Sequence, residues 1–215
     1  NSSGCLSYYV NKIAKEDLIA VVMARASGDV APHGGLERLF GTNPIAFGIP
    51  ADGKPLIFDM ATSAISWGAV DRARRNNELL PDMVAVDKFG KITRDPQKAL
   101  EGAFLTFDNS YKGYGLAMMV EIIAGVLPGA DFLNLGIGDE WGNFFLAINP
   151  NSLSSLEEFK RKVRILIERV RNSRSIDGKK IRIPGEQKIE NMNSALRNKT
   201  VEVDQAIYEE IKKLV

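Results

Sequence analysis

Residues 41–63, GTNPIAFGIPADGKPLIFDMATS, restrict the fold of this chain more than any other stretch. Two short apolar runs, Ile45–Ile49 and Leu56–Phe58, are separated by the sequence PADGKP. Proline fixes φ and an Asp-Gly pair tolerates positive φ, so the stretch predicts two strands joined by a hairpin turn. Small polar residues at positions 41–43 and 59–63 flank the runs, where hydroxyls and backbone amides could face a polar ligand. The same pattern also fits an ordinary hairpin in a mixed sheet.

The rest of the chain alternates between helical and strand patterns. We predict helices at residues 6–15, 61–75, 95–100, 112–127, 155–172, 186–196 and 203–214, and strands at residues 18–23, 45–49, 56–58, 144–148 and 180–184, with two short strands within 81–93. The helix at 112–127 is apolar on nearly every face, which is typical of a helix buried against a sheet or another subunit. Because helices and strands interleave, the predicted class is α/β with a mixed α+β sheet.

Composition and charge exclude several classes of function. The 215 residues carry a net charge of +1, which gives no strong field for nucleic acid or a membrane. The longest apolar run, residues 115–127, contains Glu121 and is too short to span a bilayer. The single Cys5 rules out an internal disulfide and fits a reducing compartment, so a cytoplasmic location is expected. No cluster of His, Cys and carboxylates has the spacing of a metal site, so none is expected.

Sequence signatures of the common nucleotide-binding folds are absent. The nearest approach to G-x-G-x-x-G is GIGDEWG at residues 136–142, which has one residue too many before its last glycine. It also follows no convincing strand, so a Rossmann fold is not predicted. A dinucleotide would have to bind by a different geometry.

Five motifs follow one another in a fixed order along the chain. Residues 30–35 read VAPHGG, 41–63 contain GTNPIAFGIP and DMATS, 112–116 read KGYGL, 144–150 read FFLAINP and 184–186 read PGE. In these motifs the sequence resembles the malate/L-lactate dehydrogenase family that is unrelated to the Rossmann dehydrogenases. Its members include ureidoglycolate, sulfolactate and archaeal malate dehydrogenases. The resemblance covers roughly the later two-thirds of a family member, so we expect the family's N-terminal helical domain to be missing.

The resemblance implies an NAD(P)-dependent oxidoreductase with a non-Rossmann NAD(P)-binding fold of the L-sulfolactate/malate dehydrogenase type. Such an enzyme transfers a hydride between NAD or NADP and a small 2-hydroxy or 2-oxo acid, such as malate, lactate or ureidoglycolate. The resemblance also implies a homodimer with the active site near the subunit interface. We expect a cofactor-binding mixed-sheet domain at residues 16–150, with helical segments at residues 1–15 and 151–215 packing with it.

The resemblance further implies which residues form the site. The cofactor-binding positions match Ser27, Asp59, Met60, Ala61, Lys112, Gly113, Gly185, Glu186 and Gln187. Thr42 and Asn43 are the expected substrate residues, and Asp59 is the expected catalytic carboxylate. Lys112 could pair with the pyrophosphate or a ribose hydroxyl, while Gly113 would let the backbone approach the cofactor. Taken alone, Lys112 also fits a solvated surface lysine, and Asp59 fits a helix cap before residue 61.

The expected proton donor is missing. Reduction of a 2-oxo acid leaves an alkoxide, and a histidine with a pKa of about 6.5 is the usual donor. The family carries this histidine in a segment like N-S-x-H-x-G before an aromatic pair, whereas here NSSG at residues 1–4 precedes Tyr8–Tyr9. The family histidine is thus absent near Ser2 and Ser3, and neither serine hydroxyl can act as a general acid near neutral pH without a partner.

Other positions that often hold histidine in the family also differ. Tyr111 and Asn143 stand at two of them, and the only histidine, His33, is interpreted as structural. The alternative function is therefore a non-catalytic or truncated relative that keeps the fold and possibly binds nucleotide.

Overall fold

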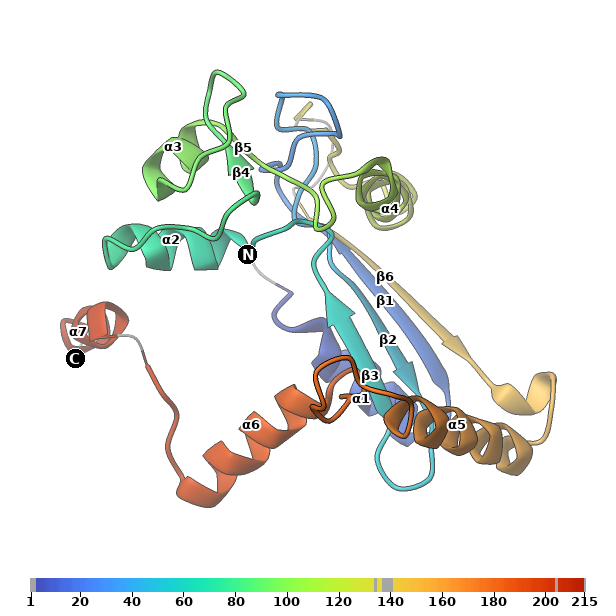
Figure 1. Ribbon diagram of the computed structural model, residues 1–215. Coiled ribbons are helices and arrows are strands. Elements are labelled where there is room, and N and C mark those ends of the chain that lie inside the picture. Colours follow the sequence, from blue (N-terminus) through green and yellow to red (C-terminus); the bar gives the residue numbers. More distant parts are fainter. Residues whose placement is uncertain (1–2, 134, 137–140, 204, 215) are drawn as a thin grey trace. The chain divides into compact units, whose positions relative to one another are not determined.

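The structure, a computed structural model, describes residues 3–133, 135–136, 141–203 and 205–214. The chain divides into two compact units, Asn1–Arg164 and Ile165–Val215. Helices and strands interleave along the first unit, while the described part of the second contains helices and loops (Figure 1). The predicted mixed α+β class is confirmed.

A four-stranded sheet forms the centre of the first unit (Figure 1). In the spatial order β3-β2-β1-β6, its strands are Leu56–Met60, Ile45–Ile49, Ile19–Arg25 and Gly142–Ile148. Each neighbouring pair is antiparallel. The predicted hairpin is confirmed, because β2 and β3 pair from Ile45 opposite Met60 through to Ile49 opposite Leu56.

One face of this sheet packs against α1 (Leu6–Lys15), which matches the predicted helix. Val10 of the helix lies in a core cluster with Val22 of β1 and Ala46 of β2, and all three side chains are fully buried. Residues with this alternating burial on β1 point to the same face, as expected for a strand whose side chains have a period of two. The helix therefore fixes the position of β1 relative to β2.

The other face packs against α4 (Tyr111–Glu121) and the π-helix η1 (Ile122–Val126) that continues it. The predicted helix at residues 112–127 is thus confirmed, although its last turns have π geometry. On the inner side, Val120 is fully buried in a cluster that also contains Ile45 of the sheet. The outer side is apolar and open in this single chain, with exposed fractions of 40% to 69% for Met118, Met119, Ile122, Val126 and Leu127.

A separate hydrophobic cluster of the first unit joins two helices and a small two-stranded sheet. These elements are α2 (Trp67–Arg75), β4 (Ala85–Val86), α3 (Pro96–Glu101) and β5 (Ala103–Phe104). Asp95 caps α3 as its sequence predicts, because the carboxylate accepts from the amides of Gln97 and Lys98. The prediction of two short strands within residues 81–93 is confirmed in part: β4 forms but pairs with β5, and the second strand is reduced to an isolated antiparallel bridge between Ile92 and Val86.

The C-terminal part of the chain is helical. After the short 3₁₀ turn η2 (Pro150–Ser152), the helices are α5 (Leu156–Arg171), α6 (Glu186–Asn198) and α7 (Gln205–Lys212). Ser155 caps α5, accepting from the amide of Glu158 at 3.2 Å. The predicted strand at residues 180–184 is wrong, because a turn ahead of α6 occupies its end. Among the described residues, no helix is long and apolar enough to cross a membrane.

Candidate active site

The antiparallel sheet gathers several predicted site segments at one of its ends. The end of β1, the start of β2, the end of β3 and the start of β6 meet there, because antiparallel neighbours alternate in direction (Figure 1). Ser27 lies exposed just beyond β1, and Thr42 lies half-buried just before β2. Residues 59–61 are half-buried where β3 ends. Residues far apart in the sequence are therefore neighbours at this end of the sheet.

Buried hydrogen bonds of Thr62 hold these segments together. The side chain is fully buried, and its hydroxyl donates to the carbonyl oxygen of Asn43 at 3.0 Å. The Thr62 amide donates to the carbonyl oxygen of Thr42, also at 3.0 Å. On its other side, the Thr62 carbonyl accepts from the amide of Phe107 at 3.0 Å. The segment that leads into α4 therefore lies directly beside the DMATS motif.

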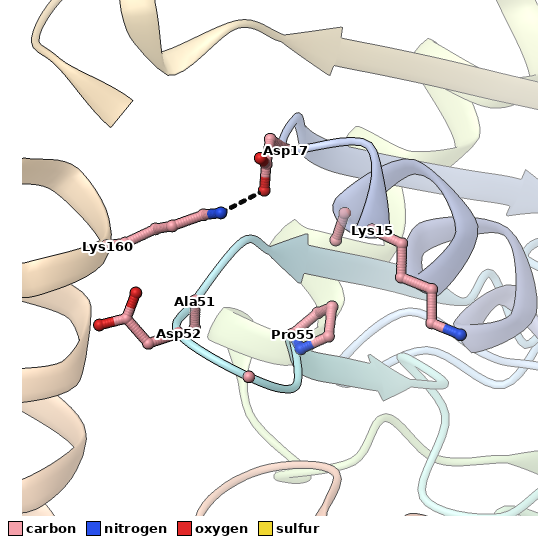
Figure 2. A pocket seen from close by; sticks show the side chains of 8 residues that line it. Lys15, Asp17, Ala51, Asp52, Pro55 and Lys160 are labelled. Atoms are coloured by element: carbon pink, nitrogen blue, oxygen red, sulfur yellow. Dashed lines mark ion pairs between the residues drawn. The ribbon is translucent and has the colours of Figure 1, made fainter. Parts of the chain in front are cut away.

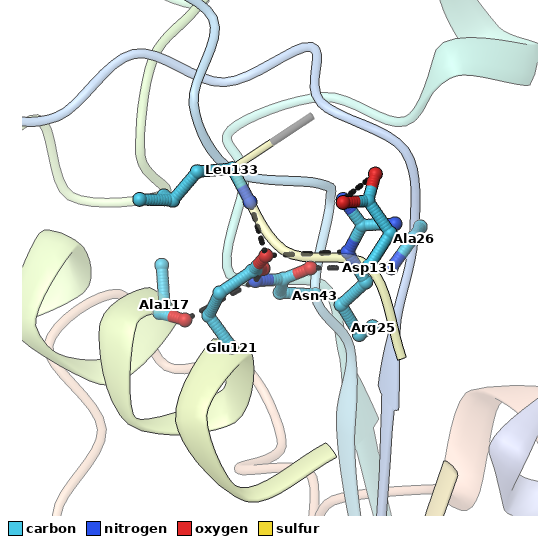
Figure 3. A network of polar contacts seen from close by, with 7 residues as sticks. All are labelled: Arg25, Ala26, Asn43, Ala117, Glu121, Asp131 and Leu133. Atoms are coloured by element: carbon cyan, nitrogen blue, oxygen red, sulfur yellow. Dashed lines mark hydrogen bonds and ion pairs between the residues drawn. The ribbon is translucent and has the colours of Figure 1, made fainter. Parts of the chain in front are cut away.

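The side chain of Asn43 is fully buried and makes contacts within the protein (Figure 3). Its Oδ1 accepts from the amide of Ala26 at 3.3 Å, and its Nδ2 donates to the carbonyl of Ala117 and to Glu121 Oε2 at 3.2 and 2.7 Å. A Cβ added to Gly41 would lie 2.3 Å from the Ala26 carbonyl oxygen. The glycine of this motif therefore permits a close approach between the end of β1 and the start of β2.

Asp59, the predicted catalytic carboxylate, lies at the N-terminal end of α1. Its Oδ2 accepts from the amide of Ser7 at 2.9 Å and from the thiol of Cys5 at 3.2 Å. The Cys5 sulfur is also 2.7 Å from the Ser7 hydroxyl oxygen. Asp59 thus satisfies an amide that the first turn of α1 leaves without an intrahelical partner. It caps α1 from across the fold, not a helix at residue 61.

The segment before α1 reaches β6 by polar and aromatic contacts. The Ser3 hydroxyl donates to Asn143 Oδ1 at 2.8 Å, and the Tyr9 hydroxyl donates to the carbonyl of Ser3 at 3.0 Å. The Tyr9 ring meets Phe145 edge-on, with centroids 5.5 Å apart. Ser3, one of the two serines where the family histidine is expected, therefore binds the start of β6.

The other serine of that pair, Ser2, lies outside the described residues, as does Asn1. Of the two positions where the family histidine is expected, the structure therefore describes only Ser3. Sequence reasoning assigned no site role to Cys5, and no local pattern could have placed it beside Asp59.

The start of α4 carries Lys112, exposed, and Gly113, buried. The amide of Lys112 donates to the Ser110 hydroxyl oxygen, and the amide of Gly113 donates to Asp108 Oδ1, each at 3.1 Å. A Cβ on Gly113 would lie 2.3 Å from that carboxylate oxygen, so contact with Asp108 requires glycine here. The hydrogen bond from the Ser110 hydroxyl lowers the pKa of Asp108, and hydrogen bonds from the backbone amides of Ser110 and Gly113 lower it further. A carboxylate therefore already occupies the N-terminal end of α4.

The predicted segment Gly185–Gln187 belongs to the second unit and begins α6. Gly185 has φ of 86°, a left-handed conformation that glycine adopts without strain. Glu186 Oε2 accepts from the amide of Ile183 at 3.0 Å, and this bond lowers the pKa of the Glu186 carboxyl; its pair with Arg171 acts in the same direction. The cofactor role of this segment stays a prediction.

A pocket of about 390 Å³ lies at the other end of β3, away from Asp59 (Figure 2). It lies between the β2–β3 turn, the end of α1 and the first part of α5, and charged side chains such as Lys15 and Asp52 line it. Lys160, also in its lining, pairs with Asp17 at 2.5 Å. None of the predicted site residues lines this pocket. Within the described ranges, no three His, Cys, Asp or Glu side chains gather as a metal ion would require.

Comparison with known families decides the classification. The family profile described as Malate/L-lactate dehydrogenase matches residues 1–212. The chain belongs to this family. Among its relatives, the L-sulfolactate dehydrogenase of Methanocaldococcus jannaschii is 38% identical over 220 residues, which cover 100% of this chain and 63% of the relative. The ureidoglycolate dehydrogenase (NAD(+)) of Escherichia coli K12 is 40% identical over 168 residues, which cover 74% of this chain and 47% of the relative.

Solved structures of family members share the fold. A malate dehydrogenase from Entamoeba histolytica superimposes with a TM-score of 0.90 at 30% identity, covering 100% of this chain and 65% of that one. The sulfolactate dehydrogenase of Methanocaldococcus jannaschii gives 0.83 at 36% identity, covering 99% and 63%. The predicted fold of the L-sulfolactate/malate dehydrogenase type is therefore confirmed. The chain spans less than two-thirds of the length of these relatives.

Proposed function

We propose that this chain belongs to an NAD(P)-dependent oxidoreductase that transfers a hydride between the nicotinamide cofactor and a small 2-hydroxy or 2-oxo acid. The observation that carries the proposal is the gathering of Ser27, Thr42, Asp59 and the start of α4 at one end of the sheet. The names of the relatives support the same class of substrate, since they include malate, sulfolactate and ureidoglycolate dehydrogenases.

The residues at this end of the sheet suit a dinucleotide. Lys112 offers an exposed ammonium group to a pyrophosphate or a ribose hydroxyl, and Ser27 offers an exposed hydroxyl. Because Asp108 and Ser110 already accept from the first amides of α4, anion binding there depends on the side chain of Lys112. Residues 60 and 61 are half-buried at the end of β3. When bound, the cofactor supplies or accepts the hydride.

We expect Asp59 to lie nearest to the site of hydride transfer. Its carboxylate is half-buried, is held by the Ser7 amide, and can accept from a ribose hydroxyl or orient a catalytic group. The carboxylate accepts from the Cys5 thiol and the Ser7 amide, whereas the chain's only imidazole, His33, lies in an exposed turn after Val30. Proton delivery to the substrate alkoxide is therefore expected to be slow.

The open apolar side of α4 and η1 supports a homodimer. A contiguous exposed apolar surface of this kind is unusual on a soluble monomer, and obligate homodimer interfaces resemble a core cut in two. In our proposal a second copy of the chain covers Met119, Ile122 and Leu127 through a two-fold axis.

Loss of absorbance from reduced nicotinamide tests the proposed activity. The chain is mixed with NADH or NADPH and a panel of 2-oxo acids that includes oxaloacetate and pyruvate. We expect turnover on at least one acid at about 10²–10⁴-fold below the roughly 10 s⁻¹ median of enzymes, the deficit that loss of a general acid produces. A rate near that median would mean that another group donates the proton.

A non-catalytic relative is the second candidate, and the position of the only histidine, His33, in an exposed turn favours it. Such a protein would bind NADH or NADPH in a Lys112-dependent manner without oxidising it. Nucleotide binding combined with no detectable turnover on any acid would select this candidate.

A further inference from the structure

The buried carboxylate of Glu121 joins three separate segments of the first unit (Figure 3). Its Oε1 accepts from Arg25 Nε, at the end of β1, and from the amide of Leu133, both at 3.2 Å. Its Oε2 accepts from Asn43 Nδ2, just before β2, at 2.7 Å. Glu121 is only 3% exposed and is the last residue of α4, where α-helical geometry changes to π. One side chain thus connects α4 to both strand ends and to the segment after η1.

The chemistry of these contacts requires a carboxylate. All three partners are N–H donors, so both oxygens of Glu121 must accept hydrogen bonds. An amide at this position would have to turn one N–H group toward a donor. The charge is compensated by Arg25, itself 1% exposed, which also lies 3.9 Å from Asp131. In the part of the chain that the structure describes, no buried side-chain nitrogen or oxygen lacks a hydrogen-bond partner.

An ion pair buried to this extent is weak evidence for stability alone. Removing two charges from water costs about as much as their attraction returns, and apolar side chains of similar volume often replace such a pair without loss. The run at residues 115–127 is otherwise free of charged residues, so Glu121 is an exception within its own helix. A fixed set of donors and acceptors nevertheless specifies one arrangement of the segments that meet there.

The segments that Glu121 fixes adjoin the proposed site. Arg25 is two residues before Ser27, and Asn43 follows Thr42 directly. Asn43 in turn accepts from the amide of Ala26, so the whole turn after β1 depends on this network.

We infer that Glu121 is a positioning residue, which holds the end of β1 and the start of β2 in the arrangement that binds the nicotinamide dinucleotide. Asn43 then acts through its buried side chain and not by touching the substrate. This inference rests on the proposed function, and it adds a role for a residue that lines no part of the surface at the site.

Two variants and a control test the inference in the full chain. Glu121→Gln keeps the shape of the side chain, but its amide N–H group must then face one of the N–H donors that the carboxylate accepts from. The double variant Glu121→Gln/Asn43→Asp reverses the polarity of that contact, so the introduced amide can donate to the introduced carboxylate while the net charge is unchanged. The carboxylate at position 43 then also faces the Ala117 carbonyl oxygen, to which Asn43 Nδ2 donates at 3.2 Å, so the repair is partial. Val70→Ala is the control, because Val70 is also fully buried but lies in the separate core cluster of α2, α3, β4 and β5 in the same unit. For each protein, dissociation constants for NADH and NADPH and backbone hydrogen exchange are measured.

We expect Glu121→Gln to weaken binding of the preferred nucleotide on the order of tenfold and to speed exchange at the amides of Ala26 and Leu133. The double variant should recover part of both effects, and Val70→Ala should show neither. Unchanged affinity in Glu121→Gln, or an equal loss in Val70→Ala, overturns the inference. If the single variant does not fold, Asn43→Ser decides, because it removes the Nδ2 donor while Glu121 stays paired with Arg25: weaker nucleotide binding supports the inference, and unchanged affinity overturns it.

Failure of the proposed function gives a different result. If the unaltered chain binds neither NADH nor NADPH, the proposed cofactor site is wrong, and hydrogen exchange alone tests the positioning role. Faster exchange at Ala26 and Leu133 in Glu121→Gln then supports that role, and unchanged exchange removes it.

Discussion

The carboxylate of Asp59 accepts a hydrogen bond from the amide of Ser7, 2.9 Å away, although 52 residues separate them in the sequence. The residue that the resemblance marks as catalytic is therefore also the residue that caps α1. Any change at this position acts on the chemistry and on the fold at once, and experiments must separate the two.

Asp59→Ala should lower the free energy of unfolding by about 1–2 kcal/mol, because the α1 amide loses its acceptor. Asp59→Asn keeps an oxygen for the Ser7 amide and should cost less. Denaturant unfolding measures both. If Asp59 also acts in hydride transfer, the turnover of Asp59→Asn falls although the helix remains capped; full turnover in Asp59→Asn would leave the residue with a structural role alone.

Lys112→Ala should weaken binding of NADH or NADPH by about 1–3 kcal/mol, the range for losing a charge-assisted hydrogen bond. Lys98 on α3 is also exposed, so Lys98→Ala is the matched control for a lost surface charge. Titration by cofactor fluorescence distinguishes them. Equal affinities in the Lys112→Ala and unaltered proteins would show that Lys112 does not contact the cofactor.

Several elements could be predicted because their signals are local. The PADGKP turn joined β2 to β3, and Asp95 before Pro96 marked the start of α3. The strand predicted at residues 180–184 failed for a local reason, since Glu186 binds the Ile183 amide and the chain turns into α6 there. The sequence of residues 180–184 did not reveal that the chain turns into α6 here and does not pair with a neighbouring strand.

The buried network could not be predicted. Arg25 and Glu121 are 96 residues apart, and nothing in either local sequence specifies the other as its partner. The only signal was the presence of Glu121 in an otherwise apolar run, which indicates a satisfied buried charge or a functional group but names no partner. The same holds for Cys5 beside Asp59. Side-chain contacts between distant segments follow from the packing of the sheet and its two helices.

The chain should sediment as a dimer at micromolar concentration. Ile122→Asp places a charge on the open apolar side of η1 and should shift the equilibrium toward the monomer of 23.6 kDa. Leu79→Asp is the control, because Leu79 is also exposed but lies beyond the end of α2. Sedimentation equilibrium gives the masses. A single species at the monomer mass for the unaltered chain would contradict the proposed dimer.

Acid should remove the contribution of the Asp71 pairs. Hydrogen bonds from Arg74 and then Arg75, at 2.7 and 2.8 Å, lower the pKa of Asp71 below its ordinary value of 3.8. A carboxyl with a lowered folded-state pKa stabilises the fold above the unfolded pKa and loses this contribution as the pH falls through the folded value. The arginines are partly exposed, so the contribution is about 0.5–1 kcal/mol.

The difference in the free energy of unfolding between the unaltered chain and Asp71→Asn should therefore be constant near neutral pH and shrink below pH 3.8. Urea unfolding at several pH values measures it. A difference that grows toward acid pH would show that the sign is wrong and that Asp71 is not stabilised as the carboxylate.

Deuterium transfer is the most direct test of the proposed function. The chain is incubated with NADH or NADPH that carries deuterium at the transferable position, together with oxaloacetate, pyruvate or another small 2-oxo acid, and the products are examined by mass spectrometry. The proposed function predicts a 2-hydroxy acid with one deuterium at C2, formed slowly by the unaltered chain and more slowly still by Lys112→Ala at the same subsaturating cofactor concentration. Bound nucleotide with no deuterium in any product, even after prolonged incubation at high protein concentration, would contradict it.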